Sequence, residues 1–121
     1  MPVITLYTNV PRDQDFDTKL ALAIAGLCPD CFNKAAERAQ VIINSGTTMT
    51  MAGTADPCAC LKIVSIGTVT PDENKVTCAK MTELIASECK IDPGRIFVDM
   101  FDVSPDMIGK GGLMLAEIMA K

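Results

Sequence analysis

The chain has 121 residues, a formal net charge of −4 and no histidine. The missing histidine excludes Ser–His and Cys–His catalysis and removes the commonest metal ligand, while the scattered Lys and Arg residues form no basic stripe for nucleic acid. A chain of this length can bury one core. Because 49% of its residues are hydrophobic, we expect part of its surface to be covered in an oligomer.

The first half of the chain is expected to form a strand, a helix and a second strand. β-branched and aromatic residues at positions 2–8 predict the first strand. Positions 15–28 predict the helix, with one face formed by Phe16, Leu20, Ile24 and Leu27. The other elements expected here are a turn at 9–12, an interruption at 28–31, a helical turn at 34–38, a strand at 39–44 and a loop at 45–57.

The apolar run at positions 20–27 is similar to the hydrophobic stretch of a signal peptide. Acidic residues at Asp13, Asp15 and Asp17 stand where a basic leader is expected, and the run is too short to span a bilayer. We therefore interpret it as a buried helix face and predict no membrane association and a cytoplasmic protein.

The second half of the chain repeats the same order of elements. A strand is expected at 58–66, a helix at 71–90 with Pro71 in its first turn, a turn at 92–94 and a strand at 95–102. Cys78, Met81, Ile85 and Cys89 are expected on the buried face of this helix.

Two β-α-β units in tandem predict the fold class. Strands joined through a helix are parallel, so the units predict an α+β fold with a four-stranded mixed sheet and both helices on one face. The bare face of that sheet is expected to pack against other subunits. We predict one domain over residues 1–121, with pseudo-repeats of architecture at about 1–50 and 58–109.

Pro2 is the candidate catalytic base. Initiator methionine is normally removed before a small residue such as proline, which would leave Pro2 with a secondary amine. Burial or a neighbouring cation lowers the pKa of such an amine, and the neutral amine can abstract a proton next to a carbonyl. If Met1 is retained, the Pro2 nitrogen is an amide and cannot act as the base.

Several spaced motifs resemble one family. They are Met-Pro-Val at 1–3, Thr-Asn-Val-Pro-Arg at 8–12, Gly-Thr-Ala-Asp-Pro-Cys-Ala at 53–59, Ser-Ile-Gly at 65–67 and Asp-Pro-Gly-Arg-Ile at 92–96. In order and spacing they resemble the macrophage migration inhibitory factor and D-dopachrome tautomerase family. The resemblance implies a homotrimer with a central barrel of sheets, active sites at the subunit interfaces, no metal and no cofactor. It also implies tautomerisation of a small aromatic keto acid or a dopachrome-like substrate.

The resemblance also implies roles for particular residues. Pro2 would be the base, Lys34 would hold the substrate carboxylate, and Ser65 and Ile66 would line the pocket, with Ile66 lending its backbone amide. Lys34 would also help to lower the pKa of the Pro2 amine. The family usually has proline after this lysine, whereas this chain has Ala35.

Two further pocket positions carry unexpected residues. Alternation in the last strand predicts Phe97, Asp99 and Phe101 on one face. Phe97 replaces a tyrosine of migration inhibitory factor and cannot donate a hydrogen bond. We expect an ionised Asp99 to repel an anionic substrate, or to pair with Lys34 or Pro2, which predicts a slower enzyme or a preference for uncharged substrates. A protonated Asp99 could instead donate a proton.

The six cysteines allow two other hypotheses about function. The Cys-x-x-Cys pair at 28–31 and the Cys-x-Cys pair at 58–60 would suit a dithiol redox site or a four-thiolate zinc site. The second pair is spaced too closely for the usual zinc knuckle, so we expect free thiols and no metal.

The alternative function is a signalling ligand. The resemblance is compatible with a cytokine-like factor, secreted without a signal peptide, that binds a cell-surface receptor. Phe97 and Asp99 favour this hypothesis, whereas Pro2 and Lys34 favour the enzyme. Positions 111–121 depart from the family; Leu113, Leu115 and Ile118 could begin a terminal strand or cover a neighbour.

Overall fold

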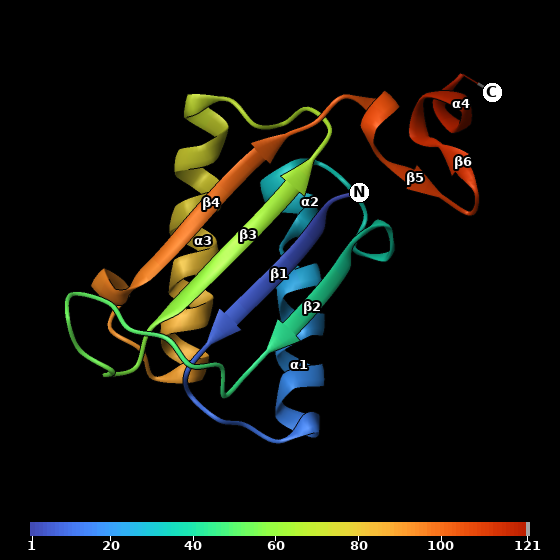
Figure 1. Ribbon diagram of the computed structural model, residues 1–121. Coiled ribbons are helices and arrows are strands. Elements are labelled where there is room, and N and C mark those ends of the chain that lie inside the picture. Colours follow the sequence, from blue (N-terminus) through green and yellow to red (C-terminus); the bar gives the residue numbers. More distant parts are fainter. Residues whose placement is uncertain (121) are drawn as a thin grey trace.

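The computed structural model describes residues 1–120 and contains a four-stranded sheet backed by two long helices (Figure 1). The main elements are β1 (Val3–Thr8), α1 (Gln14–Ala25), α2 (Cys28–Phe32), β2 (Gln40–Asn44), β3 (Ala59–Ser65), α3 (Pro71–Cys89) and β4 (Ile96–Asp102). Short 3₁₀ turns occupy Ala36–Arg38, Pro93–Arg95 and Pro105–Met107. The tail adds β5 (Gly109–Lys110), β6 (Leu113–Met114) and α4 (Leu115–Met119).

The sheet is mixed, in the order β2-β1-β3-β4. β1 pairs with β2 and β3 pairs with β4 in parallel, each pair being joined through a long helix, while β1 and β3 run antiparallel in the centre. This topology confirms the predicted α+β fold of tandem β-α-β units.

The core lies between the sheet and the helices. Along β1 and β3 every second side chain is buried, as in Ile4, Leu6, Leu61 and Ile63. Both long helices lie behind the sheet, and among residues 1–120 no helix covers the opposite face (Figure 1). This arrangement leaves Phe97 61% exposed and Phe101 45% exposed on that open face.

The two long helices, α1 and α3, each begin directly after a residue that caps the N-terminus of the helix. Asp13 accepts a hydrogen bond from the Phe16 amide at 2.8 Å, and Thr70 accepts one from the Glu73 amide at 3.3 Å before Pro71 opens α3. Each cap satisfies one backbone donor that the first helical turn leaves free.

The predicted first helix is too long at its C-terminal end. α1 ends at Ala25, and residues 28–32 form the separate helix α2 rather than an interruption. Pro29 is tolerated in the first turn of α2, because the amide it lacks would have no partner there. Cys28 and Cys31 both lie in α2, and both are buried in the core.

Cys78 is exposed, so its predicted place in the core is wrong. The buried residues of α3 are Thr77, Met81, Ile85 and Cys89. Each step of four residues turns the helix by about 40° beyond a full turn, so the buried stripe winds around α3. Cys78 points in nearly the same direction as Cys89, but at its own level on the helix that direction is exposed.

The tail folds into a hairpin and a short helix. Gly111 and Gly112, with φ of 64° and 85°, form the two-residue turn between β5 and β6. The Leu115 amide donates to the Ile108 carbonyl at 2.9 Å, which ties the start of α4 to the segment before the hairpin. Leu113 therefore lies in a terminal strand, whereas Ile118 lies in a helix that the sequence analysis missed.

Within residues 1–120, no helix is both long enough and apolar enough to cross a membrane.

Candidate functional site

Pro2 lies directly before β1 and is fully buried. Its carbonyl accepts a hydrogen bond from the Gln40 amide at 3.0 Å. The Met1 amine donates to the Arg38 carbonyl at 2.8 Å. The backbone therefore holds the N-terminus in place beside the 3₁₀ turn that contains Arg38.

Lys34 reaches the end of β3 next to this N-terminus. Its ammonium donates to Ser65 Oγ at 3.4 Å and to the Ile66 carbonyl at 3.0 Å. Asn33, in the left-handed conformation with φ of 53°, ends α2 just before Lys34. Burial and the nearby Arg38 lower the pKa of Lys34, while Asp102 acts in the opposite direction. The polar contact to Ile66 uses its carbonyl, and the predicted role of its amide stays a prediction.

The N-terminus lies between two adjoining hollows of about 750 and 320 Å³. Met1, Arg38, Lys110 and Leu115 line both hollows. Lys34 and Ile66 line the larger hollow, and Pro2 lines the smaller one. We call the two hollows together the N-terminal cleft. The cleft thus brings together Pro2, Lys34 and Ile66, and Ser65 contacts Lys34 from the core.

The charges around the cleft disfavour a second positive charge at the N-terminus. Burial lowers the pKa of the terminal amine below its ordinary value, and the charges of Lys34, Lys110 and Arg38 lower it further. Cys28 acts weakly in the opposite direction. An amine at this place is therefore more easily held neutral, as a general base requires.

Several residues of the cleft escaped the sequence analysis. Arg38 and Lys110 supply two of its cations, and the tail supplies one apolar wall through Leu113, Leu115, Ile118 and Met119. The only signal in the sequence for this wall was the apolar spacing of the tail. That spacing does not show where the tail lies, because its return to the N-terminus depends on the hairpin turn at Gly111 and Gly112.

Phe97 and Asp99 lie outside the N-terminal cleft of the same chain. They stand opposite Cys60 and Lys62 in the pairing of β3 and β4, on the open face of the sheet. Lys62 is three residues from Ser65 along β3, which corresponds to about 10 Å.

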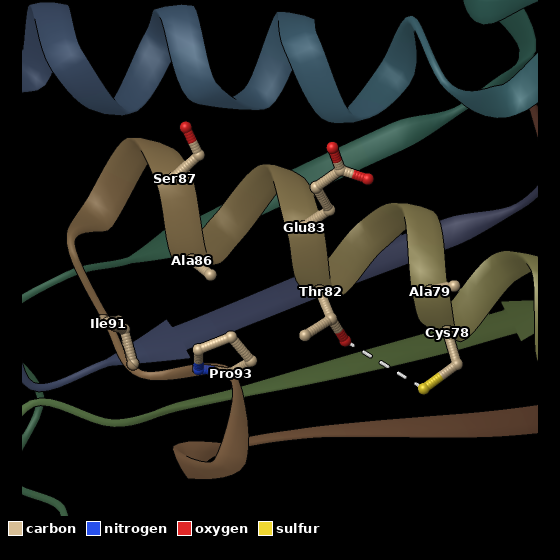
Figure 2. Close-up of a pocket in the computed structure, with 8 residues that line it drawn as sticks. All are labelled: Cys78, Ala79, Thr82, Glu83, Ala86, Ser87, Ile91 and Pro93. Carbon is tan, nitrogen blue, oxygen red and sulfur yellow. Dashed lines mark hydrogen bonds between the residues drawn. The ribbon is translucent and has the colours of Figure 1, made fainter.

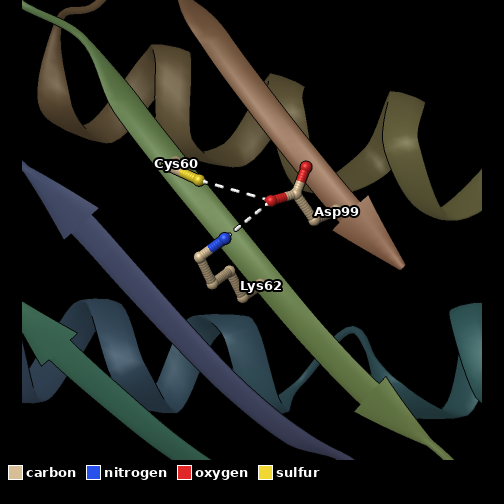
Figure 3. A network of polar contacts seen from close by, with 3 residues as sticks. All are labelled: Cys60, Lys62 and Asp99. Atoms are coloured by element: carbon tan, nitrogen blue, oxygen red, sulfur yellow. Dashed lines mark hydrogen bonds and ion pairs between the residues drawn. The ribbon is translucent and has the colours of Figure 1, made fainter. Parts of the chain in front are cut away.

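The partner of Asp99 within the chain is Lys62, not Lys34 or Pro2 as the sequence suggested. Its carboxylate accepts from Lys62 Nζ at 2.8 Å and from Cys60 Sγ at 3.7 Å (Figure 3). Parallel pairing sets Lys62 directly across from Asp99 on the same face, which favours an opposite-charge pair. Burial, together with the nearby Asp99 carboxylate, raises the pKa of the Cys60 thiol.

The cysteines are all free thiols. Among residues 1–120 no group of three or more Cys, Asp or Glu side chains is placed to hold a metal ion. Burial raises the pKa of Cys28 and of Cys31, which disfavours the thiolate that redox exchange requires.

A second groove of about 640 Å³ lies along α3, and none of the candidate site residues lines it; Figure 2 shows the residues that do. Cys78 and Thr82 face each other there, with 4.0 Å between Sγ and Oγ1. Small or apolar residues make up most of the remaining lining, and Glu83 adds a carboxylate. The groove lacks the cations and the chain terminus that distinguish the N-terminal cleft.

Comparison with known proteins shows the family and the fold of the chain. The D-dopachrome decarboxylase of Gallus gallus is 33% identical over 111 residues, covering 91% of this chain and 93% of the relative. A macrophage migration inhibitory factor homolog of Brugia malayi is 29% identical over 112 residues, covering 93% and 96%. The solved homologue from Prochlorococcus marinus has a TM-score of 0.87 at 19% identity, covering 93% and 98%, which shows the shared fold. Residues 1–116 match the family described as macrophage migration inhibitory factor (MIF), and the chain therefore belongs to that family.

Proposed function

We propose that the mature protein is a keto–enol tautomerase whose base is the secondary amine of Pro2, freed by removal of Met1. The neutral amine takes a proton from the carbon next to a keto group, and the electron pair of that C–H bond moves to give the enolate. The resulting ammonium returns a proton to the enolate oxygen, which completes the enol and restores the neutral amine. Lys34 holds the substrate carboxylate.

One observation carries this proposal: the N-terminus lies in a cleft where burial and three cations lower the pKa of an amine. Removal of Met1 would place the Pro2 nitrogen in the same surroundings, since Pro2 is buried and lines the cleft itself. The ammonium of Lys34 has three donors and uses two of them on Ser65 and Ile66, which leaves one for a carboxylate.

A homotrimer would complete the site. The open face of the sheet carries the exposed Phe97 and Phe101 beside Lys62 and Asp99, and a second copy packed there would cover them. Within one chain Phe97 and Asp99 lie outside the cleft, so the homotrimer is the arrangement in which they would line a cleft, that of a neighbouring copy. The relative from Gallus gallus, named D-dopachrome decarboxylase, supports a dopachrome-like compound as an alternative to phenylpyruvate-like substrates.

The test is turnover of 4-hydroxyphenylpyruvate by protein whose mass confirms that Met1 is absent. We expect turnover by the mature protein and its loss in the Pro2→Gly variant, which replaces the secondary amine of proline with a primary amine. Lys19→Gln, an exposed charge on α1, is the control and is expected to keep full activity. Full activity in Pro2→Gly, or in protein that retains Met1, would contradict the proposed base.

A cytokine-like signalling ligand, secreted without a signal peptide and bound by a cell-surface receptor, is the second candidate. The relatives of Brugia malayi and Wuchereria bancrofti, both named macrophage migration inhibitory factor homologs, support it. Correctly processed protein that turns over neither keto acids nor a dopachrome ester would favour this role over the enzyme.

A further inference from the structure

We propose that the N-terminal cleft selects keto acids that carry two anionic groups, one bound by Lys34 and the other by Arg38 together with Lys110. This inference rests on the proposed tautomerase function and names its substrate class. It departs from one of the two alternatives that Asp99 suggested in the sequence, a preference for uncharged substrates, and leaves the other, a slower enzyme, as a prediction.

The three cations occupy two places around the N-terminus. Lys34 lines only the larger of the two hollows. Its ammonium is held by hydrogen bonds to Ser65 Oγ and to the Ile66 carbonyl. Arg38 and Lys110 line both hollows and so stand where the two meet, beside Met1. A substrate whose reacting carbon lies at the N-terminus can therefore direct one anionic group to each place.

None of these cations is neutralised by an ion pair among residues 1–120, where the ion pairs are Lys62–Asp99 and Lys80–Asp30. The larger hollow has no acidic residue in its lining; Glu37 lines only the smaller hollow, and Asp102 acts on Lys34 from outside both. Within one chain a single carboxylate would leave two of the three cations uncompensated. The Asp99 that a neighbouring copy would bring to the cleft is already paired with Lys62 at 2.8 Å, so it does not replace the second anionic group of the substrate. A second anionic group offers Arg38 a partner for its planar fork of donors.

The apolar wall of the cleft fits the spacer between the two anionic groups. The tail residues that line the larger hollow, together with Lys34, Arg38 and Lys110, are Leu113, Leu115, Ile118 and Met119. A hollow of about 750 Å³ is within the range that holds a small organic ligand. The wall favours an aromatic or other apolar spacer, so the ligand class is an aryl keto acid with a second carboxylate on its ring.

The first experiment compares kcat/KM for 4-carboxyphenylpyruvate and 4-hydroxyphenylpyruvate, which differ in one ring substituent. We expect the mature protein to favour the dianion by about tenfold, since a charge-assisted hydrogen bond is worth roughly that factor. The double variant Arg38→Gln, Lys110→Gln should lose most of this ratio. Lys19→Gln, which removes a distant charge, should retain it. A ratio near one in the unaltered protein, or an unchanged ratio in the double variant, would overturn the inference.

A second experiment measures binding without turnover. By calorimetry, terephthalate should bind the mature protein about tenfold more tightly than 4-methylbenzoate, with the difference shrinking as salt screens the charges. If neither keto acid is turned over but terephthalate keeps its advantage, the proposed function fails and the dianion site stands. If keto acids are turned over without preference and terephthalate has no advantage, the function stands and the dianion site fails.

Discussion

Replacing Lys34 with glutamine is expected to weaken catalysis on an anionic keto acid while leaving the fold intact. The glutamine amide can still donate a hydrogen bond to Ser65 Oγ, which is fully buried, or to the Ile66 carbonyl. The variant therefore removes the positive charge without leaving the buried hydroxyl of Ser65 unpaired.

The magnitude follows from the donors that Lys34 has free. Two of its three N–H groups are used at 3.4 and 3.0 Å, so one charge-assisted hydrogen bond to the substrate is lost. Such a bond contributes about 1.5–3 kcal/mol, which corresponds to roughly a 10- to 100-fold fall in kcat/KM.

The assay is steady-state turnover of phenylpyruvate by protein free of Met1, with Lys19→Gln as the matched charge control. A melting curve for each variant establishes that equal amounts of folded protein are compared. A fall of less than about twofold in Lys34→Gln would refute the assignment of Lys34 as the carboxylate-binding group, because it corresponds to less than the roughly 0.5 kcal/mol that even a weak neutral hydrogen bond contributes.

Three other predictions concern pH, the core and the loop before β3. Activity should rise with pH through the pKa of the Pro2 amine, because only the neutral amine accepts a proton. Arg38→Gln should move that rise to higher pH, since removing a nearby cation raises the pKa of the amine. An unmoved pH–rate profile in this variant would contradict the prediction. Ile85→Ala should lower the free energy of unfolding in urea by about 2–5 kcal/mol, whereas Val76→Ala, on the exposed side of α3, should cost far less. Arg95→Ala should speed proteolysis of the loop at 51–57, because the Arg95 guanidinium holds this loop by three hydrogen bonds. It donates to the carbonyls of Pro57, Met51 and Asp56 at 2.9, 3.1 and 3.0 Å. An unchanged cleavage pattern would show that other contacts hold the loop.

The amino-acid sequence alone was enough to predict the four strands of the main sheet and the long helices that connect them in pairs. Alternation in β1 and β3 and the apolar spacing in α1 and α3 are periodic signals that report which face of each element is buried. Parallel pairing then follows from helical crossovers, which is why the four-stranded sheet could be predicted. Cys78 shows the limit of this reasoning, because periodicity gives a direction on the helix but not the level at which the helix meets the sheet.

The candidate site likewise has a part that could be predicted from the sequence and a part that could not. Pro2 and Lys34 were predicted from the start of the chain and from a resemblance between motifs, and the structure brings both to one cleft. Arg38, Lys110 and the apolar wall of the tail became part of it only through tertiary structure, because a two-glycine turn folds the tail back beside the N-terminus. The register of β3 and β4 likewise gave Asp99 the partner Lys62. Local propensity and periodicity act over a few residues, so they specify elements and faces. Which distant side chains share one cleft is decided by how those elements pack.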